Sequence, residues 1–157
     1  MSPCNSNHES RLHQFFIKTA KNLALESRCV SRKVGALIVQ NNRIISMGYN
    51  GTPSGIDIEC SKVFASDFDR ETHHQWSKIH EIHAEMNAIL FAAKSGISID
   101  GAVMYVTLHP CDECLKNIMQ SGISHVFYLE EYDKATHSNP MKTLMIEKGQ
   151  ITRLQSI

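Results

Sequence analysis

The chain has 157 residues, of which 42% are hydrophobic and 20% are charged, as expected for a single globular domain over residues 1–157. Sixteen lysines and arginines balance sixteen aspartates and glutamates, and this zero net charge argues against a polynucleotide or an anionic membrane as partner, because both call for clustered basic residues. Neither a secretory signal nor an uncharged stretch long enough to span a bilayer is evident, so we expect a cytoplasmic protein.

The first expected element is an amphipathic helix over residues 10–27, because apolar side chains recur there at helical spacing. Ser10 is a candidate for its N-cap. A hairpin follows, with strands at 34–39 and 43–49 that are joined by a turn at Asn41-Asn42.

The glycine-rich segment 48–55 is typical of backbone that turns and approaches a ligand closely. About thirty residues without a clear period then lead to His80, and their cysteine, histidine and tryptophan content indicates a functional loop. Further elements are expected as a helix at 83–94, a strand at 103–108, a helix at 112–120, a strand at 125–129, a helix from Asn139-Pro140 to about 148, and a strand at 151–154. This order predicts a mixed sheet with helices on both faces.

Two motifs contain the residue types that bind zinc: His83-Ala84-Glu85 and, about 25 residues further on, Pro110-Cys111-Asp112-Glu113-Cys114. One imidazole and two thiols, from His83, Cys111 and Cys114, make three protein ligands, the count of a catalytic zinc with a position left for water. If the cysteines begin a helix they share one face, where the helix dipole favours their thiolates. The odd number of five cysteines also indicates metal ligands and buried thiols more than disulfides.

Together the motifs are similar to the H-x-E and P-C-x-x-C signature of zinc-dependent nucleobase deaminases. A C-x-x-C pair alone is weak evidence, because a redox pair or a structural zinc fits it equally well. In such a site Glu85 is expected to be the catalytic residue, taking the protons of water and returning one to the base and the other to the departing amine.

Most of the chain resembles deoxycytidylate deaminases, viral and cellular enzymes that convert dCMP to dUMP. The similarity lies in Ser27-Arg28, Val34-Gly35-Ala36, the segment from Gly48 to Gly55, the segment from His83 to Ile89, and the segment from Thr107 to Cys111. It implies an α/β fold of the cytidine-deaminase class, with three layers and a mixed five-stranded sheet. It further implies a zinc-dependent hydrolase that supplies dUMP for dTMP synthesis, in the host cytoplasm if the source is viral.

The same resemblance assigns residues to the substrate. Asn50 would bind the sugar and help to fix the pyrimidine, Ala84 would lie at the substrate, and Tyr132 would lie over it near its phosphate. Arg28 and Lys33 are candidates for the positive charge beside that phosphate. The turn-forming tendency of asparagine is an alternative explanation for Asn50, as an ordinary loop aromatic is for Tyr132.

Regulation and assembly are also implied. Members of the family are typically homohexamers that dCTP activates and dTTP inhibits, with Mg²⁺ accompanying the nucleotide. Their regulatory site includes the glycine-rich loop, which here contributes Gly48, Asn50 and Gly51.

Phage-type members carry a second, structural zinc, and Cys29, Cys60 and His73 fall in the corresponding regions of this chain. Asp69, Glu59 and His74 are candidates for a fourth ligand. Buried thiols and surface histidines are the alternative explanation of these residues.

Two other functions compete with dCMP deamination. One is a zinc deaminase for tRNA adenosine or a free nucleoside, although the zero net charge argues against a polynucleotide substrate. The other is a zinc-stabilised binding module without turnover, against which Glu85 argues, since a structural site is closed by a fourth protein ligand.

Overall fold

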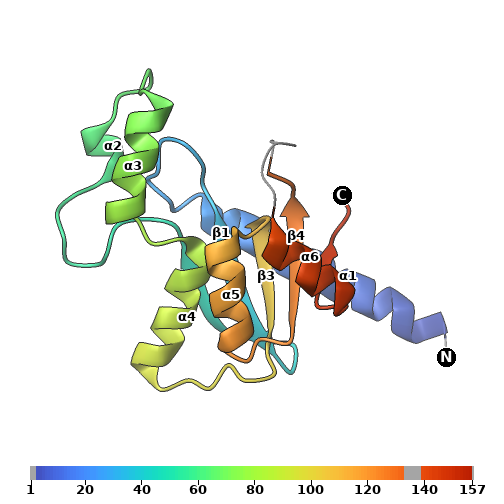
Figure 1. Ribbon diagram of the computed structural model, residues 1–157. Helices are drawn as coiled ribbons and strands as arrows, with labels where there is room; N and C mark the ends of the chain where they lie inside the picture. The colour runs from blue at the N-terminus through green and yellow to red at the C-terminus, as the bar shows by residue number, and fades with distance from the viewer. Residues whose placement is uncertain (1–2, 133–138, 157) are drawn as a thin grey trace.

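A mixed five-stranded sheet forms the centre of this computed structural model, which describes residues 3–132 and 139–156, with side chains from residue 7 onward (Figure 1). The strand order is β2-β1-β3-β4-β5. Antiparallel pairing joins β1 (Gly35–Gln40) to β2 (Arg43–Tyr49) and to β3 (Val103–Leu108). Parallel pairing then joins β3 to β4 (His125–Glu130) and β4 to β5 (Ile151–Arg153). The predicted change from antiparallel to parallel pairing is confirmed.

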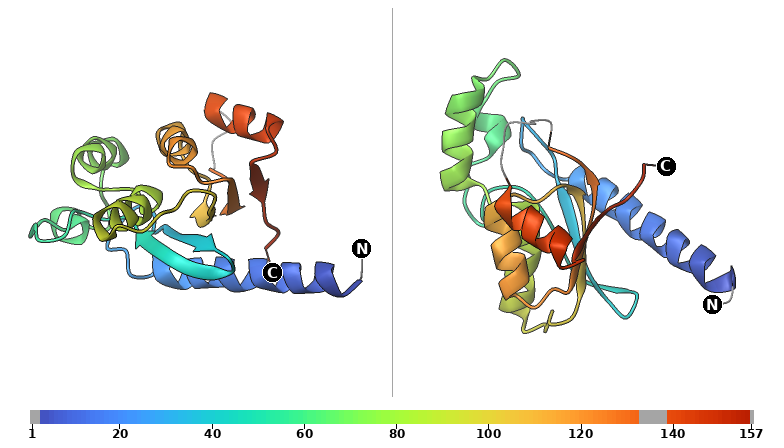
Figure 2. Two further views of the ribbon diagram at one scale, coloured as in Figure 1. Left: turned by 90° about the horizontal axis from the view of Figure 1, so that it is seen from below. Right: turned by 45° about the vertical axis from the view of Figure 1, so that its right-hand side comes forward.

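Helices cover both faces of the sheet, as predicted (Figure 2). The helix α1 (Pro3–Ala24) lies against one face, where Phe16 packs with Leu37 and Tyr105. The other face carries α4 (Ala84–Ser95), α5 (Asp112–Gln120) and α6 (Pro140–Glu147) over a larger apolar core. Within the described ranges, no helix is both long and apolar enough to cross a bilayer.

The structure differs from the sequence prediction at two places. Ser10 lies inside α1 rather than at its N-cap, because the helix continues into the polar residues from Pro3 onward, where no apolar period marks it. The segment predicted to be a loop contains α2 (Cys60–Val63) and α3 (Arg70–His80). Of the α3 residues only His73 is buried, so this helix lacks the apolar stripe that a sequence pattern detects.

Two features of the hairpin depend on particular residues, and the second of them places α4. Asn41 and Asn42 both adopt positive φ, at 51° and 59°, which gives the tight turn that their sequence predicts. Gly48 on β2 then lies so close to α4 that an added Cβ would stand 2.6 Å from the carbonyl oxygen of Ala84. The absent side chain therefore lets the first turn of α4 pack directly on the sheet.

Candidate active site

The N-termini of α4 and α5 bring together the three side chains predicted as zinc ligands. His83 is the N-cap residue of α4, and Cys111 is the N-cap residue of α5. The Nδ1 atom of His83 lies 3.3 Å from the Sγ atom of Cys114 and 3.6 Å from that of Cys111. All three donor atoms lie within 4.8 Å of one another, close enough to share one metal ion.

Hydrogen bonds within this cluster set which of its side chains carry protons when no metal is bound. A hydrogen bond from Cys114, with a further one from His83, lowers the pKa of Cys111 to about 4. The partner thiol Cys114 has its pKa raised, first by that same hydrogen bond and then by burial. The hydrogen bond with Cys111 raises the pKa of His83 to about 9. The cluster thus holds protons on His83 and Cys114 that a bound metal ion would displace, as zinc binding to such ligands requires.

Glu85 occupies the first turn of α4 and is almost completely buried, with 4% of its surface exposed. Burial raises the pKa of this carboxyl group to about 7, although a main-chain hydrogen bond and the nearby charge of His83 oppose the shift. A carboxyl group with such a pKa exchanges a proton readily at neutral pH, which is the property that a general acid and base needs. Ala84, between it and His83, has no exposed surface.

Asn50 uses its side chain to hold the segment that leads into β1. Its Nδ2 donates to the carbonyl oxygen of Arg32, and its Oδ1 accepts from the N–H of Val34, each at 2.8 Å. Its neighbour Gly51 pairs with Ile82, one residue before His83, through hydrogen bonds in both directions. The glycine-rich loop thereby lies directly beside the segment that carries the histidine.

Tyr132 lies two residues beyond β4 with about half of its surface, 51%, exposed. The guanidinium group of Arg32 lies over its ring, 4.9 Å from the ring centre, in a cation–π contact. Arg32 was not singled out by the sequence, because only the fold brings the segment before β1 next to the segment after β4.

The two candidates for phosphate-side charge have different surroundings. Arg28 forms an ion pair with Glu59. Lys33 lines a cavity of about 620 Å³ between the end of α1 and the start of α3, and both residues line a neighbouring one of about 790 Å³. Further basic side chains that line the first of these cavities are Lys21, Arg32 and Arg70.

A second cluster of metal-binding side chains lies between α2, α3 and the segment after α1, and its members are Cys29, Cys60, His73 and Glu81. The Nε2 atom of His73 lies 3.2 Å from the Sγ of Cys60 and 3.6 Å from that of Cys29. The Oε2 of Glu81 accepts a hydrogen bond from Ser77 at 2.6 Å, whereas its Oε1 is buried and has no hydrogen-bond partner among the described residues. Because a buried carboxylate oxygen without a partner is costly, a cation here would satisfy it.

The fourth member of this cluster differs from the three candidates proposed from the sequence. The side chain of Asp69 caps α3 by accepting from the N–H of Thr72. Glu59 is paired with Arg28, and His74 is exposed on the outer side of α3. Glu81 takes the place instead, because it is the C-cap residue of α3 and lies about two helical turns after His73, on the side of the helix that faces the cysteines. The signal available in the sequence is its spacing of eight residues from His73, which places both side chains on one face if the segment is helical.

Comparison with known proteins agrees with this geometry. A family model described as the cytidine and deoxycytidylate deaminase zinc-binding region matches residues 10–130. The chain belongs to this deaminase family. Deoxycytidylate deaminase from Enterobacteria phage T2 is 46% identical to it over 140 residues, covering 69% of the chain and 74% of the relative. The chain is also similar to ComE operon protein 2 from Bacillus subtilis, at 39% identity over 89% of the chain and 68% of the relative.

Solved structures of dCMP deaminases have the same fold as this chain. The dCMP deaminase of cyanophage S-TIM5 in complex with dCMP and dUMP superimposes with a TM-score of 0.70 at 30% identity, covering 98% of this chain and 99% of that one. Its apo form gives a TM-score of 0.71 over 98% and 100%. Both the α/β fold and the deaminase family that the sequence predicted are therefore confirmed.

Proposed function

We propose that this chain is a zinc-dependent dCMP deaminase, which hydrolyses dCMP to dUMP and ammonia and supplies dUMP for dTMP synthesis in the cytoplasm, a host cytoplasm if the source is viral. The observation that carries the proposal is the cluster of His83, Cys111 and Cys114 beside the buried Glu85. Its substrate is inferred from the relatives, since phage proteins that are 46% identical are named deoxycytidylate deaminases.

In this proposal some residues of the site bind the metal and another transfers protons. Bound zinc would supply a Lewis acid that lowers the pKa of water from 15.7 to about 7, making it nucleophilic near neutral pH. His83, Cys111 and Cys114 would hold the ion and leave one position open. The carboxylate of Glu85 would take one proton from the attacking water and deliver it to N3 of cytosine. It would then pass the second proton of that water, from the new hydroxyl group at C4, to the amine that departs as ammonia. Its pKa of about 7 allows both directions of transfer.

Binding of the nucleotide is assigned to three residues around this centre. Ala84 is assigned to the substrate by the family resemblance, although its surface is covered in this structure, and Tyr132 would lie over the substrate near the phosphate. Asn50 would bind the sugar with the donor and acceptor capacity that remains on its amide after its two main-chain hydrogen bonds. Those bonds support the assignment, because they fix the direction of the amide before substrate arrives.

The second cluster would hold a structural zinc with Cys29, Cys60, His73 and Glu81 as ligands. Four side chains of these types complete a tetrahedral site and leave no position for water. Burial raises the pKa of Cys60 to about 12 and also raises that of Cys29, so both thiols are protonated at neutral pH without a metal. A bound zinc ion would replace these protons and accept the free oxygen of Glu81.

Regulation follows the pattern of the family in this proposal: dCTP with Mg²⁺ activates a homohexamer, and dTTP inhibits it. Gly48, Asn50 and Gly51 would belong to the regulatory nucleotide site. The pairing of Gly51 with Ile82 supports this assignment, because it gives a nucleotide at the loop a direct connection to the segment of His83.

Ammonia release from zinc-loaded protein tests the proposal. The substrates are dCMP, dCTP, deoxycytidine and an adenosine-containing tRNA stem-loop, each with and without dCTP plus Mg²⁺ or dTTP plus Mg²⁺. Turnover of dCMP that dCTP raises and dTTP suppresses is the expected result. If the stem-loop or deoxycytidine alone reacts, another deaminase activity replaces this one, and if nothing reacts, the zinc-stabilised binding module is supported.

A further inference from the structure

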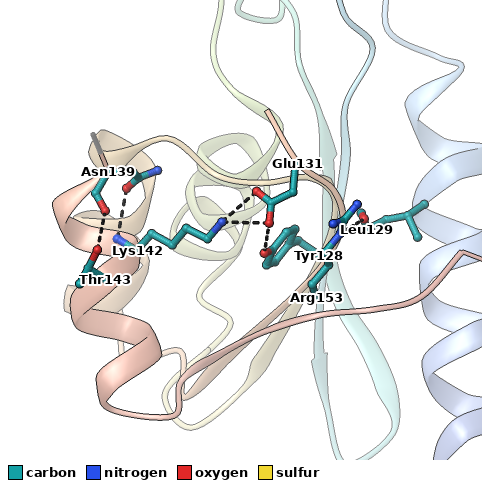
Figure 3. A network of polar contacts seen from close by, with 7 residues as sticks. All are labelled: Tyr128, Leu129, Glu131, Asn139, Lys142, Thr143 and Arg153. Atoms are coloured by element: carbon teal, nitrogen blue, oxygen red, sulfur yellow. Dashed lines mark hydrogen bonds and ion pairs between the residues drawn. The ribbon is translucent and has the colours of Figure 1, made fainter. Parts of the chain in front are cut away.

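Outside the zinc cluster, a network of charged side chains connects α6 to the end of β4 (Figure 3). The Nζ atom of Lys142, in the first turn of α6, donates to both carboxylate oxygens of Glu131, at 3.0 and 2.8 Å. The hydroxyl group of Tyr128 donates to the same carboxylate at 2.5 Å. Lys142 also lies 5.2 Å from the centre of the Tyr128 ring. Glu131 is therefore held from two sides.

The position of Glu131 in the chain gives this network its importance. It lies between Glu130, the last residue of β4, and Tyr132, the residue proposed to cover the substrate. The carbonyl oxygen of Glu130 accepts from the N–H of His109, two residues before the proposed ligand Cys111. The bonds to the side chain of Glu131 thus hold the main chain at the residue directly before Tyr132.

The lysine itself is fixed with respect to the zinc cluster. The side chain of Asn139 caps α6 by accepting from the N–H of Lys142, as Figure 3 shows. The N–H of Met141 donates to Asp112, the residue that follows Cys111. These contacts join the start of α6 to the start of α5, so Lys142 is anchored to the same helix end that carries two proposed zinc ligands.

An isolated ion pair on a protein surface contributes little, because water screens it and two long side chains lose freedom. This pair differs in three respects. Only 21% of the Lys142 side chain and 39% of the Glu131 side chain are exposed. The lysine bonds both oxygens, and Tyr128 supplies a further donor. Burial opposes the charge of Glu131, but the bonds from Lys142 and Tyr128 outweigh it and lower the pKa of the carboxyl group.

We propose that Lys142 is a positioning residue, which holds Tyr132 in its substrate-binding place through the carboxylate of Glu131. The inference rests on the proposed dCMP deaminase activity. Without the lysine, Glu131 loses its main partner, and the position of Tyr132 then depends more strongly on its cation–π contact with Arg32. Nucleotide binding then weakens, whereas the chemistry at the zinc, which Lys142 does not contact, continues.

The test compares three variants of the full-length, zinc-loaded enzyme with dCMP as substrate: K142M, K142R and, as a matched control, K148M. Lys148 is an exposed residue at the other end of α6, and it forms no ion pair with any residue that the structure describes. For K142M we expect KM to rise about three- to tenfold, with kcat within about twofold of the parent value and unchanged zinc content. K142R restores a KM near the parent value, because a guanidinium group also bonds both oxygens.

Two further measurements separate positioning from a general loss of structure. If Lys142 acts through Glu131, the E131Q variant raises KM, and adding K142M to it changes little more. Additive effects, or a fall in kcat and zinc content together with the rise in KM, would overturn the proposal. An unchanged KM in K142M overturns it as well.

A crystal structure of K142M decides the case independently of activity. The Tyr132 ring should leave its place beside Arg32, and an unmoved ring contradicts the inference. If the unmodified protein fails to turn over dCMP, the proposed function is refuted, while the position of Tyr132 in this crystal still decides whether Lys142 fixes it.

Discussion

Glu81 and His83 lie two residues apart, yet their side chains belong to different clusters of metal-binding groups. The residue between them, Ile82, pairs with Gly51 of the glycine-rich loop. The segment 81–83 therefore joins the end of α3 to the start of α4, and its central residue is fixed by main-chain hydrogen bonds to the glycine-rich loop. We therefore expect a change at the second cluster to affect a proposed ligand of the catalytic zinc through this short, restrained connection.

Replacing Cys60 with alanine tests this connection. We expect the zinc content to fall from about two ions per chain to one or fewer, because a tetrahedral site with three ligands binds its ion less tightly. The thermal midpoint should fall, and the remaining zinc should be removed by a chelator more quickly than from the parent protein. E59Q is the matched control, since Glu59 was a candidate ligand from the sequence but pairs with Arg28. Two retained zinc ions in C60A would contradict the second site.

Most of the sheet, and the three proposed ligands of the catalytic zinc, could be predicted from the sequence. Strands such as β3 have short apolar runs, and Gly96, in the left-handed conformation, marks the end of α4. The two zinc motifs are short, and the spacing of residues within each one is enough to predict a metal site. The helix α3, Glu81 and Lys142 could not be predicted in this way. Their roles depend on contacts between distant segments, and a polar helix or a single charged residue has no periodic pattern.

Asn50 has a structural role that can be measured apart from substrate binding. Its amide satisfies the carbonyl oxygen of Arg32 and the N–H of Val34, so N50A leaves two main-chain groups without partners. We expect the free energy of unfolding to fall by about 1–3 kcal/mol. Urea denaturation measures this change, with N22A on the exposed side of α1 as the control. A stability equal to that of N22A would show that solvent replaces both bonds.

Gly48 and Gly51 should respond differently to alanine although both are proposed for the regulatory site. A Cβ on Gly48 would stand 2.6 Å from main-chain atoms of Ala84 and Ala88, whereas one on Gly51 would meet nothing within 4 Å. G48A is therefore expected to lose about 1–3 kcal/mol of stability and to bind zinc poorly, since α4 must shift. G51A should unfold like the parent protein, and any change in its response to dCTP or dTTP reports on nucleotide binding. Equal stability of the two variants would contradict this packing.

The pair of Glu131 and Lys142 predicts a dependence of stability on pH. The pKa of Glu131 is lower in the folded protein than its ordinary value of 4.5, because the bonds to Lys142 and Tyr128 outweigh the opposing effect of burial. Stability from a lowered pKa is present above 4.5 and is lost as the pH falls through the folded value. The parent protein should therefore exceed E131Q in stability at pH 7, and this difference should shrink below pH 4.5. Urea unfolding across this range measures it, with E113Q, which removes an exposed carboxylate, as the control.

The central claim is that Glu85 transfers protons at a zinc ion held by His83, Cys111 and Cys114. Its most direct test is the E85Q variant, with zinc content and dCMP turnover measured on the same sample. Because glutamine keeps the shape but cannot accept or return a proton, we predict the zinc content of the parent protein and a fall in kcat of about 10²- to 10⁴-fold. Turnover at the parent rate, with zinc bound, would contradict the account.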